Sequence, residues 1–339
     1  MSQIVVYILV FFSVFAAILP MVAFVAVIWW LDRYDREPVW MVLLTFLWGA
    51  LGGAGLSLFG NTLLHLLINA VLGPESAEWM GPVLVAPLIE EPTKAVILLL
   101  VATSRYFDNT TDGFVYGAAA GLGFGMTENM LYFYQSAQIA GFDLNHGIMS
   151  WGGTVVIRTF FSAVMHATAS SIIGAFIGWS RFRGLFLKFL SIPVGVVLAM
   201  GIHALWNGLL VLGGQIADEA LMFYVNLALL PLEVLLVFGV FQLSLLAEKR
   251  TLLRELTEEA EHGVLPLKHV EPLSSYLGRN ATAFLPAPKL QDHYIRTVTT
   301  LAFRKHQARH APEHRAGFYA DEIERLRREV RGLLQNTDQ

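Results

Sequence analysis

Seven long apolar stretches occupy most of the first 246 residues of this 339-residue chain. A membrane-spanning α-helix needs about 20 mostly apolar residues, and lipid leaves no other way to satisfy the backbone of an isolated segment. The stretches are 4–31, 39–71, 79–103, 113–135, 149–179, 184–213 and 220–246. The sequence therefore predicts an all-α polytopic membrane protein, a bundle of about seven transmembrane helices. A bundle of eight transmembrane helices is the alternative, because the second stretch could divide near Gly60 and Asn61.

The composition agrees with a membrane protein. Hydrophobic residues make up 55% of the chain and charged residues only 15%, which is too apolar for an average soluble domain. Cysteine is absent, and this excludes disulfides and thiolate catalysis. We expect the lipid bilayer as a partner and no nucleic acid, and the oligomeric state is left open.

The composition changes sharply at about Ala247. Residues 247–339 hold 15 of the 23 Lys and Arg, and two segments there, 247–261 and 320–334, have helical patterns. Prolines separate the two segments. The sequence thus predicts two domains, a transmembrane catalytic bundle over 1–246 and a partly helical C-terminal tail over 247–339.

Basic residues alternate between successive loops. Lys or Arg occur in 32–38, 104–112, 180–188 and directly after 246, whereas 72–78, 136–148 and 214–219 contain neither. Cytoplasmic loops carry the excess of positive charge. The pattern predicts a cell-membrane protein with an outside amino terminus and a cytoplasmic tail, and it favours an odd number of spans.

Glu90 and Glu91 are adjacent in the middle of the third apolar stretch. An ionised carboxylate at that depth costs roughly 2.5–3.5 kcal/mol even on the lenient insertion scale. Two neighbouring carboxylates also repel each other, so we expect one of them to hold a proton. Lys94 lies one helical turn away and could neutralise the other. A purely structural ion pair would need only one carboxylate.

The next three stretches each carry an unusual polar group: Glu128, His166 and His203. At about 1.5 Å per residue, these groups and Glu90 fit one layer in the central to outer half of the bilayer. Glycines at 113, 117, 121 and 125 form a ridge that would bring the fourth helix close to a neighbour. The pattern indicates acid–base or metal chemistry inside the membrane.

Four motifs follow one another on consecutive stretches, between about residues 80 and 210. They are Glu90-Glu91-x-x-Lys94, Phe124-x-x-x-Glu128, Arg158 leading to His166, and His203-x-x-x-Asn207. In this order they resemble the PrsW family of intramembrane proteases. The related CAAX prenyl endopeptidases and abortive-infection membrane proteases usually have Arg at longer spacing in place of Lys94, and His in place of Glu128. These departures favour the PrsW branch.

The resemblance implies endoproteolysis of a membrane-anchored protein. The best-known role of the family is the first cut of a membrane-anchored anti-sigma factor on its extracytoplasmic side, and the outward bias of the polar layer fits that side. Glu90 or Glu91 would be the general base, and Lys94 would keep its partner glutamate ionised. His203 and Asn207 would donate hydrogen bonds to the oxyanion, and this role is suggested by the resemblance to the prenyl endopeptidases.

Glu128 and His166 would then orient or polarise the attacking water. The family has also been described as metalloproteases, and two histidines with a glutamate can form a catalytic zinc site. Glu128, His166 and His203 are therefore the candidate Zn²⁺ ligands. The chain has no H-E-x-x-H motif, so metal-dependent and metal-free mechanisms both stay open.

Three alternative functions remain. Buried Glu and His could serve a proton-coupled or metal-ion transporter, although no internal repeat supports one. A prenyl- or bacteriocin-type processing protease would use similar motifs on other substrates. A non-catalytic scaffold or sensor acting through the tail would tolerate replacement of the Glu and His residues.

Overall fold

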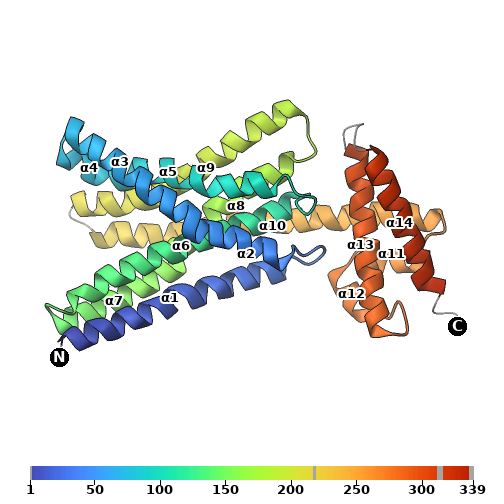
Figure 1. Cartoon of the computed structure of the whole chain (residues 1–339), viewed down its shortest axis with the longest axis horizontal. Coiled ribbons are helices and arrows are strands. Elements are labelled where there is room, and N and C mark those ends of the chain that lie inside the picture. The colour runs from blue at the N-terminus through green and yellow to red at the C-terminus, as the bar shows by residue number, and fades with distance from the viewer. Residues whose placement is uncertain (1, 217–218, 311–315, 336–339) are drawn as a thin grey trace. The chain divides into compact units, whose positions relative to one another are not determined.

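A computed structural model of the chain describes residues 2–216, 219–310 and 316–335 (Figure 1). Every regular element in these ranges is helical, which confirms the predicted all-α architecture. Five helical segments there are long and apolar enough to cross a membrane: Gln3–Leu31, Val39–Leu72, Leu144–Ser180, Leu185–Leu212 and Leu227–Glu261. The stretches 79–103 and 113–135 are also helical but are not among them, so seven spans remains a prediction.

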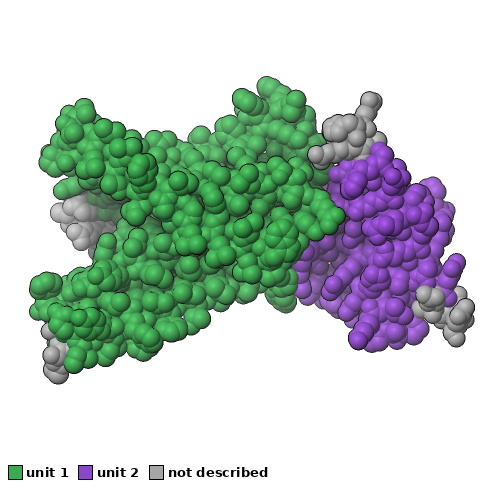
Figure 2. All heavy atoms as spheres, in the orientation of Figure 1, with its two compact units in different colours: residues 1–31, 37–240 green, residues 32–36, 241–339 purple. Residues whose placement is uncertain are grey.

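The chain folds into two compact units (Figure 2). Unit 1 contains residues 1–31 and 37–240, and unit 2 contains residues 32–36 and 241–339. The predicted domain boundary at 246 lies inside a single long helix, α10 (Glu219–Glu261), and stays a prediction.

Unit 1 consists of long helices, several of which are interrupted by short π-helical segments. They follow the order α1 (Ser2–Leu31), α2 (Val39–Leu47), η1 (Trp48–Gly53), α3 (Ala54–Leu72), α4 (Pro74–Met80), η2 (Gly81–Val85), α5 (Ala86–Val101), α6 (Thr110–Ile139), α7 (Leu144–Ile157), η3 (Arg158–Ser162), α8 (Ala163–Ser180) and α9 (Leu185–Ile216). Helix α3 continues through Gly60 and Asn61, so the second apolar stretch does not divide there.

Helix α6 is largely buried, and it packs closely on α8. Its first turn is fixed by a capping box, in which the Asn109 side chain accepts from the backbone N–H of Asp112 and the Asp112 side chain accepts in return. A Cβ added at Gly117 would lie 2.3 Å from the carbonyl oxygen of Ser170, and one at Gly121 equally close to that of His166. The glycine ridge therefore brings the two backbones into contact, as predicted.

Unit 2 is a folded helical unit with a core of its own. The end of α10 is followed by α11 (Leu267–Leu273), α12 (Tyr276–Ala281), α13 (Pro288–His310) and α14 (Ala316–Gln335). Leu252, Leu256, Tyr294, Leu301 and Val330 are among the buried residues of this core. The helical pattern predicted for 247–261 and 320–334 is confirmed, and the described residues between them contribute three further helices.

Candidate active site

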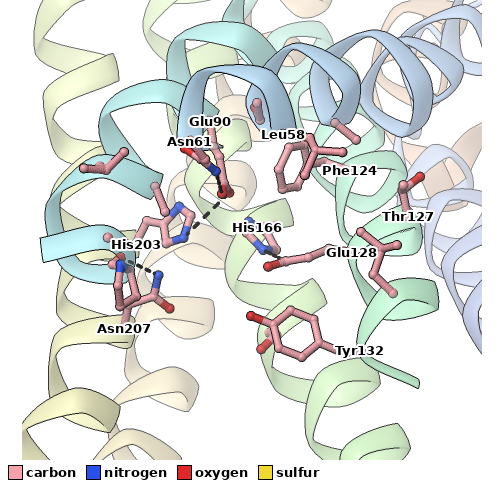
Figure 3. Close-up of a pocket in the computed structure, with 18 of the residues that line it drawn as sticks. Leu58, Asn61, Glu90, Phe124, Thr127, Glu128, Tyr132, His166, His203 and Asn207 are labelled. Carbon is pink, nitrogen blue, oxygen red and sulfur yellow. Dashed lines mark hydrogen bonds and ion pairs between the residues drawn. The ribbon is translucent and has the colours of Figure 1, made fainter. Parts of the chain in front are cut away.

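A cavity of about 870 Å³ in unit 1 contains most of the predicted site residues (Figure 3). Its wall includes Glu90, Glu128, Arg158, His166, His203 and Asn207. Glu91 and Lys94 lie behind this wall and contact it through hydrogen bonds. All three π-helical segments supply lining residues, and such segments are often found at functional sites.

The adjacent glutamates on α5 have different surroundings. Glu91 is fully buried, and its Oε1 accepts from Lys94 Nζ at 2.6 Å and contacts His203 Nδ1 at 2.8 Å. Glu90 lies on the cavity wall, where its Oε1 accepts from Asn61 Nδ2 at 3.0 Å. Glu90 Oε2 is buried and has no hydrogen-bond partner among the described residues. His203 Nε2 lies 3.9 Å from it.

The hydrogen bonds indicate the tautomers of both histidines. An ammonium only donates, so the contact of 3.2 Å between Lys94 Nζ and His166 Nδ1 makes Nδ1 the acceptor. Nε2 of a neutral His166 then carries the proton and donates to Glu128 Oε2 at 2.7 Å. In a neutral His203, Nδ1 donates to Glu91, which leaves the lone pair of Nε2 directed toward Glu90.

Glu128 is the site carboxylate that is most open to the cavity. Its side chain is 23% exposed, compared with 7% for Glu90 and none for Glu91. Arg158 Nη2 pairs with Glu128 Oε2 at 2.7 Å, and the guanidinium lies 3.7 Å from the centre of the Tyr132 ring. Glu128 is therefore held in place by an ion pair and remains accessible from the cavity.

Asn207 on α9 donates from Nδ2 to the carbonyl oxygen of Pro82 at 2.9 Å. This carbonyl belongs to η2, the π-helical segment before α5. A side-chain amide carries two N–H groups, so one remains for a group in the cavity. The amide is thus anchored at the wall.

Glu90, His166 and His203 form the group most suitable for a metal ion among the described residues. One ligand atom from each lies within 4.8 Å of the other two. The sequence prediction had Glu128 in place of Glu90, but Glu128 pairs with Arg158 and His166 and is not part of this group.

The three residues fit a divalent cation chemically. Glu90 Oε2 is a buried oxygen without a hydrogen-bond partner, and nitrogen and carboxylate oxygen are zinc ligands. The bond between His203 Nδ1 and Glu91 is the kind of carboxylate support that ligating histidines have. His166 contacts Lys94 and Glu128 through its two nitrogens, so it would have to release one of them to ligate.

Sequence reasoning missed Asn61 as a member of the site. The sequence marks it only as a point where the second span could divide. The available signal was the four-residue spacing of Ser57, Asn61 and His65 along an apolar helix, because such a spacing puts three polar groups on one helix face.

Comparisons with known proteins agree with the motifs. A family model described as "PrsW family intramembrane metalloprotease" matches residues 37–236. The chain is similar to a protein named Protease PrsW from Bacillus subtilis (strain 168), with 30% identity over 171 residues, covering 49% of this chain and 68% of the relative. It is also similar to proteins of the same name from Geobacillus kaustophilus (strain HTA426) and Clostridioides difficile (strain 630).

The Geobacillus protein is 27% identical over 221 residues, covering 64% of this chain and 85% of the relative. The Clostridioides protein is 28% identical over 154 residues, covering 45% and 59%. No solved structure matches the chain. Residues 237–339 lie outside the matched family region.

Proposed function

This chain belongs to the PrsW family of intramembrane metalloproteases, and we propose that it hydrolyses a peptide bond of a membrane-anchored protein at the cavity described above. The observation that carries this proposal is the buried Glu90 Oε2, which faces His203 Nε2 across 3.9 Å without a hydrogen bond. An unpaired buried polar atom costs about 1–3 kcal/mol. A water molecule or an ion bound between the two atoms would remove that cost.

Glu90, His166 and His203 are the residues that would hold the metal. A divalent cation bound there would polarise the scissile carbonyl and lower the pKa of a bound water to about 7. Zn²⁺ suits this donor set. In this assignment Glu90 is a ligand, which replaces the general-base role that the sequence had suggested for it or for Glu91.

Glu128 is then the general base, because it is the other carboxylate on the cavity wall. Arg158 holds Glu128 Oε2, which leaves the second oxygen to accept the proton of the attacking water. The free N–H of Asn207 would stabilise the oxyanion. Glu91 would orient the ring of His203, and Lys94 would keep Glu91 ionised, without either touching the substrate.

We also propose the orientation that the loop charges predict, with the amino terminus outside and unit 2 in the cytoplasm. A site in the outer half of the bilayer would then cut substrates near their extracytoplasmic side. The ends of the fragments test this directly, because cleavage from the opposite side would leave them near the cytoplasmic face.

Quantitative mass spectrometry of membrane-protein fragments tests the function. Cells without the protein are compared with cells that carry the wild type, Glu90→Gln, Glu128→Gln or the control Glu75→Gln, a glutamate in an exposed position on α4. We expect fragments of a single-span protein with the wild type and the control only. Identical fragments with Glu90→Gln would refute the proposal, and ion transport in vesicles without any fragments would favour the transporter.

A further inference from the structure

Asn61 is a polar residue on α3, a helix that is apolar enough to be part of a membrane span. Its Nδ2 donates to Glu90 Oε1 at 3.0 Å, and both residues line the cavity (Figure 3). An amide in an apolar environment costs free energy unless it is hydrogen-bonded. Among the described residues, its Oδ1 is buried without a partner. Asn61 therefore satisfies a carboxylate oxygen while one of its own polar atoms stays unpaired.

The contact between α3 and α5 is built around this hydrogen bond. A Cβ at Gly60 would lie 2.7 Å from Ile89 Cγ2, so a larger residue there would displace the side chain that precedes Glu90. One turn away, the hydroxyls of Ser57 and Thr93 are 2.8 Å apart. Trp48 Nε1 donates to the carbonyl oxygen of Thr93 at 3.0 Å. The backbone that carries Glu90 is thus held against α3 on both sides of the residue.

The hydrogen bond decides which carboxylate oxygen faces His203. An ionised carboxylate only accepts, so the Asn61 amide must present its N–H₂ group to Glu90. Because Glu90 Oε1 accepts from Asn61, Glu90 Oε2 is directed toward His203 Nε2. Without Asn61, the carboxylate could turn about its last torsion, and neither oxygen would have a fixed direction.

We propose that Asn61 is a positioning residue, which orients the Glu90 carboxylate for its part in the reaction and does not touch the substrate. This inference rests on the proposed protease function. Groups that orient metal ligands or catalytic carboxylates typically contribute 10- to 100-fold to metal affinity or activity. We expect an effect of that size from the loss of this one hydrogen bond.

Three substitutions separate orientation from packing. Asn61→Leu keeps the approximate volume and removes every polar atom. Asn61→Asp keeps the shape, removes the donor and places a second carboxylate beside Glu90. Asn61→Gln keeps the donor on a longer side chain. Asn69→Leu is the matched control, because Asn69 lies two turns further along α3 in an exposed position.

The variants are assayed as full-length protein in lipid nanodiscs, with the single-span protein whose cleavage in cells requires the wild-type enzyme. We expect kcat to fall 10- to 100-fold in Asn61→Leu and at least as far in Asn61→Asp, with KM within about threefold of wild type. Asn61→Gln should recover part of the loss, and Asn69→Leu should match wild type. Zn²⁺ alone should bind Asn61→Leu 10- to 100-fold more weakly.

The outcomes distinguish this inference from the proposed function. Wild-type kcat in Asn61→Leu and Asn61→Asp, with Glu90→Gln inactive, would overturn the role of Asn61 and leave the protease intact. A rise in KM without a fall in kcat would also overturn it, because it would make Asn61 a substrate contact. Cleavage that continues in Glu90→Gln would instead overturn the proposed function. If Asn61→Leu does not reach the membrane, the isosteric Asn61→Asp decides.

Discussion

Replacing Lys94 by Met should destabilise unit 1 far more than an average substitution does. Lys94 and Glu91 are fully buried, with 2.6 Å between Nζ and Oε1. At an effective dielectric constant of about 20, two unit charges at this distance attract each other by about 6 kcal/mol. Desolvation of the pair offsets part of that attraction. We therefore expect Lys94→Met to lower the free energy of unfolding by about 3–5 kcal/mol, the usual cost of leaving a buried charge without its partner.

The double variant Glu91→Gln/Lys94→Met isolates the ion pair from the rest of the packing. It removes both charges, so it should be more stable than the sum of the two single changes predicts, with a coupling energy of up to about 3 kcal/mol. Lys94 Nζ also lies 4.6 Å from the centre of the Phe124 ring, and both variants that replace Lys94 lose this contact. Activity should stay low in the double variant, because His203 Nδ1 then faces an amide in place of the Glu91 carboxylate.

Equilibrium unfolding in mixed micelles, titrated with sodium dodecyl sulfate, measures these free energies. The wild type, both single variants and the double variant complete the cycle. A cost below about 1 kcal/mol for Lys94→Met, or additivity within about 0.5 kcal/mol, would refute the argument that this pair is buried and tightly coupled.

Three other predictions follow from separate parts of the structure. Gly121→Ala should lower the free energy of unfolding, measured by thermal unfolding, by about 1–3 kcal/mol or more, because its Cβ would lie 2.3 Å from the His166 carbonyl oxygen. The control Gly55→Ala places its Cβ in open space and should be neutral or stabilising. Dialysis against a zinc chelator should abolish cleavage and added Zn²⁺ should restore it; undiminished cleavage after verified metal removal would favour a metal-free mechanism with Glu90 as the base. Burial, with His310 and Arg254 nearby, lowers the pKa of His306 in unit 2 to about 4. As the pH falls from about 6.5, the unfolded chain therefore takes up a proton that the folded unit does not; hydrogen exchange of α13 should show stability declining toward pH 4, and His306→Gln should flatten that decline.

The sequence by itself determined the helical class and the candidate site residues. Long apolar runs can satisfy their backbones in lipid only as helices, so the architecture followed from hydropathy. The high cost of charge in lipid singled out Glu90, Glu91, Glu128, His166 and His203. The four-residue spacing of the glycines similarly predicted the close approach of α6 to a neighbouring helix, which is α8.

Only the tertiary structure decided which of these side chains contact one another. Helical periodicity gives the face on which a residue lies, but it fixes neither the rotamer nor the register between helices. Lys94 meets His166 across 72 positions of sequence, and Glu91, not Glu90, bonds His203 Nδ1. For the same reason, the candidate metal group contains Glu90 instead of Glu128. Asn61 belongs to the site because α3 packs on α5 and brings its side chain to Glu90. The sequence of one helix does not give its distance from another, so this hydrogen bond could not be predicted from the sequence.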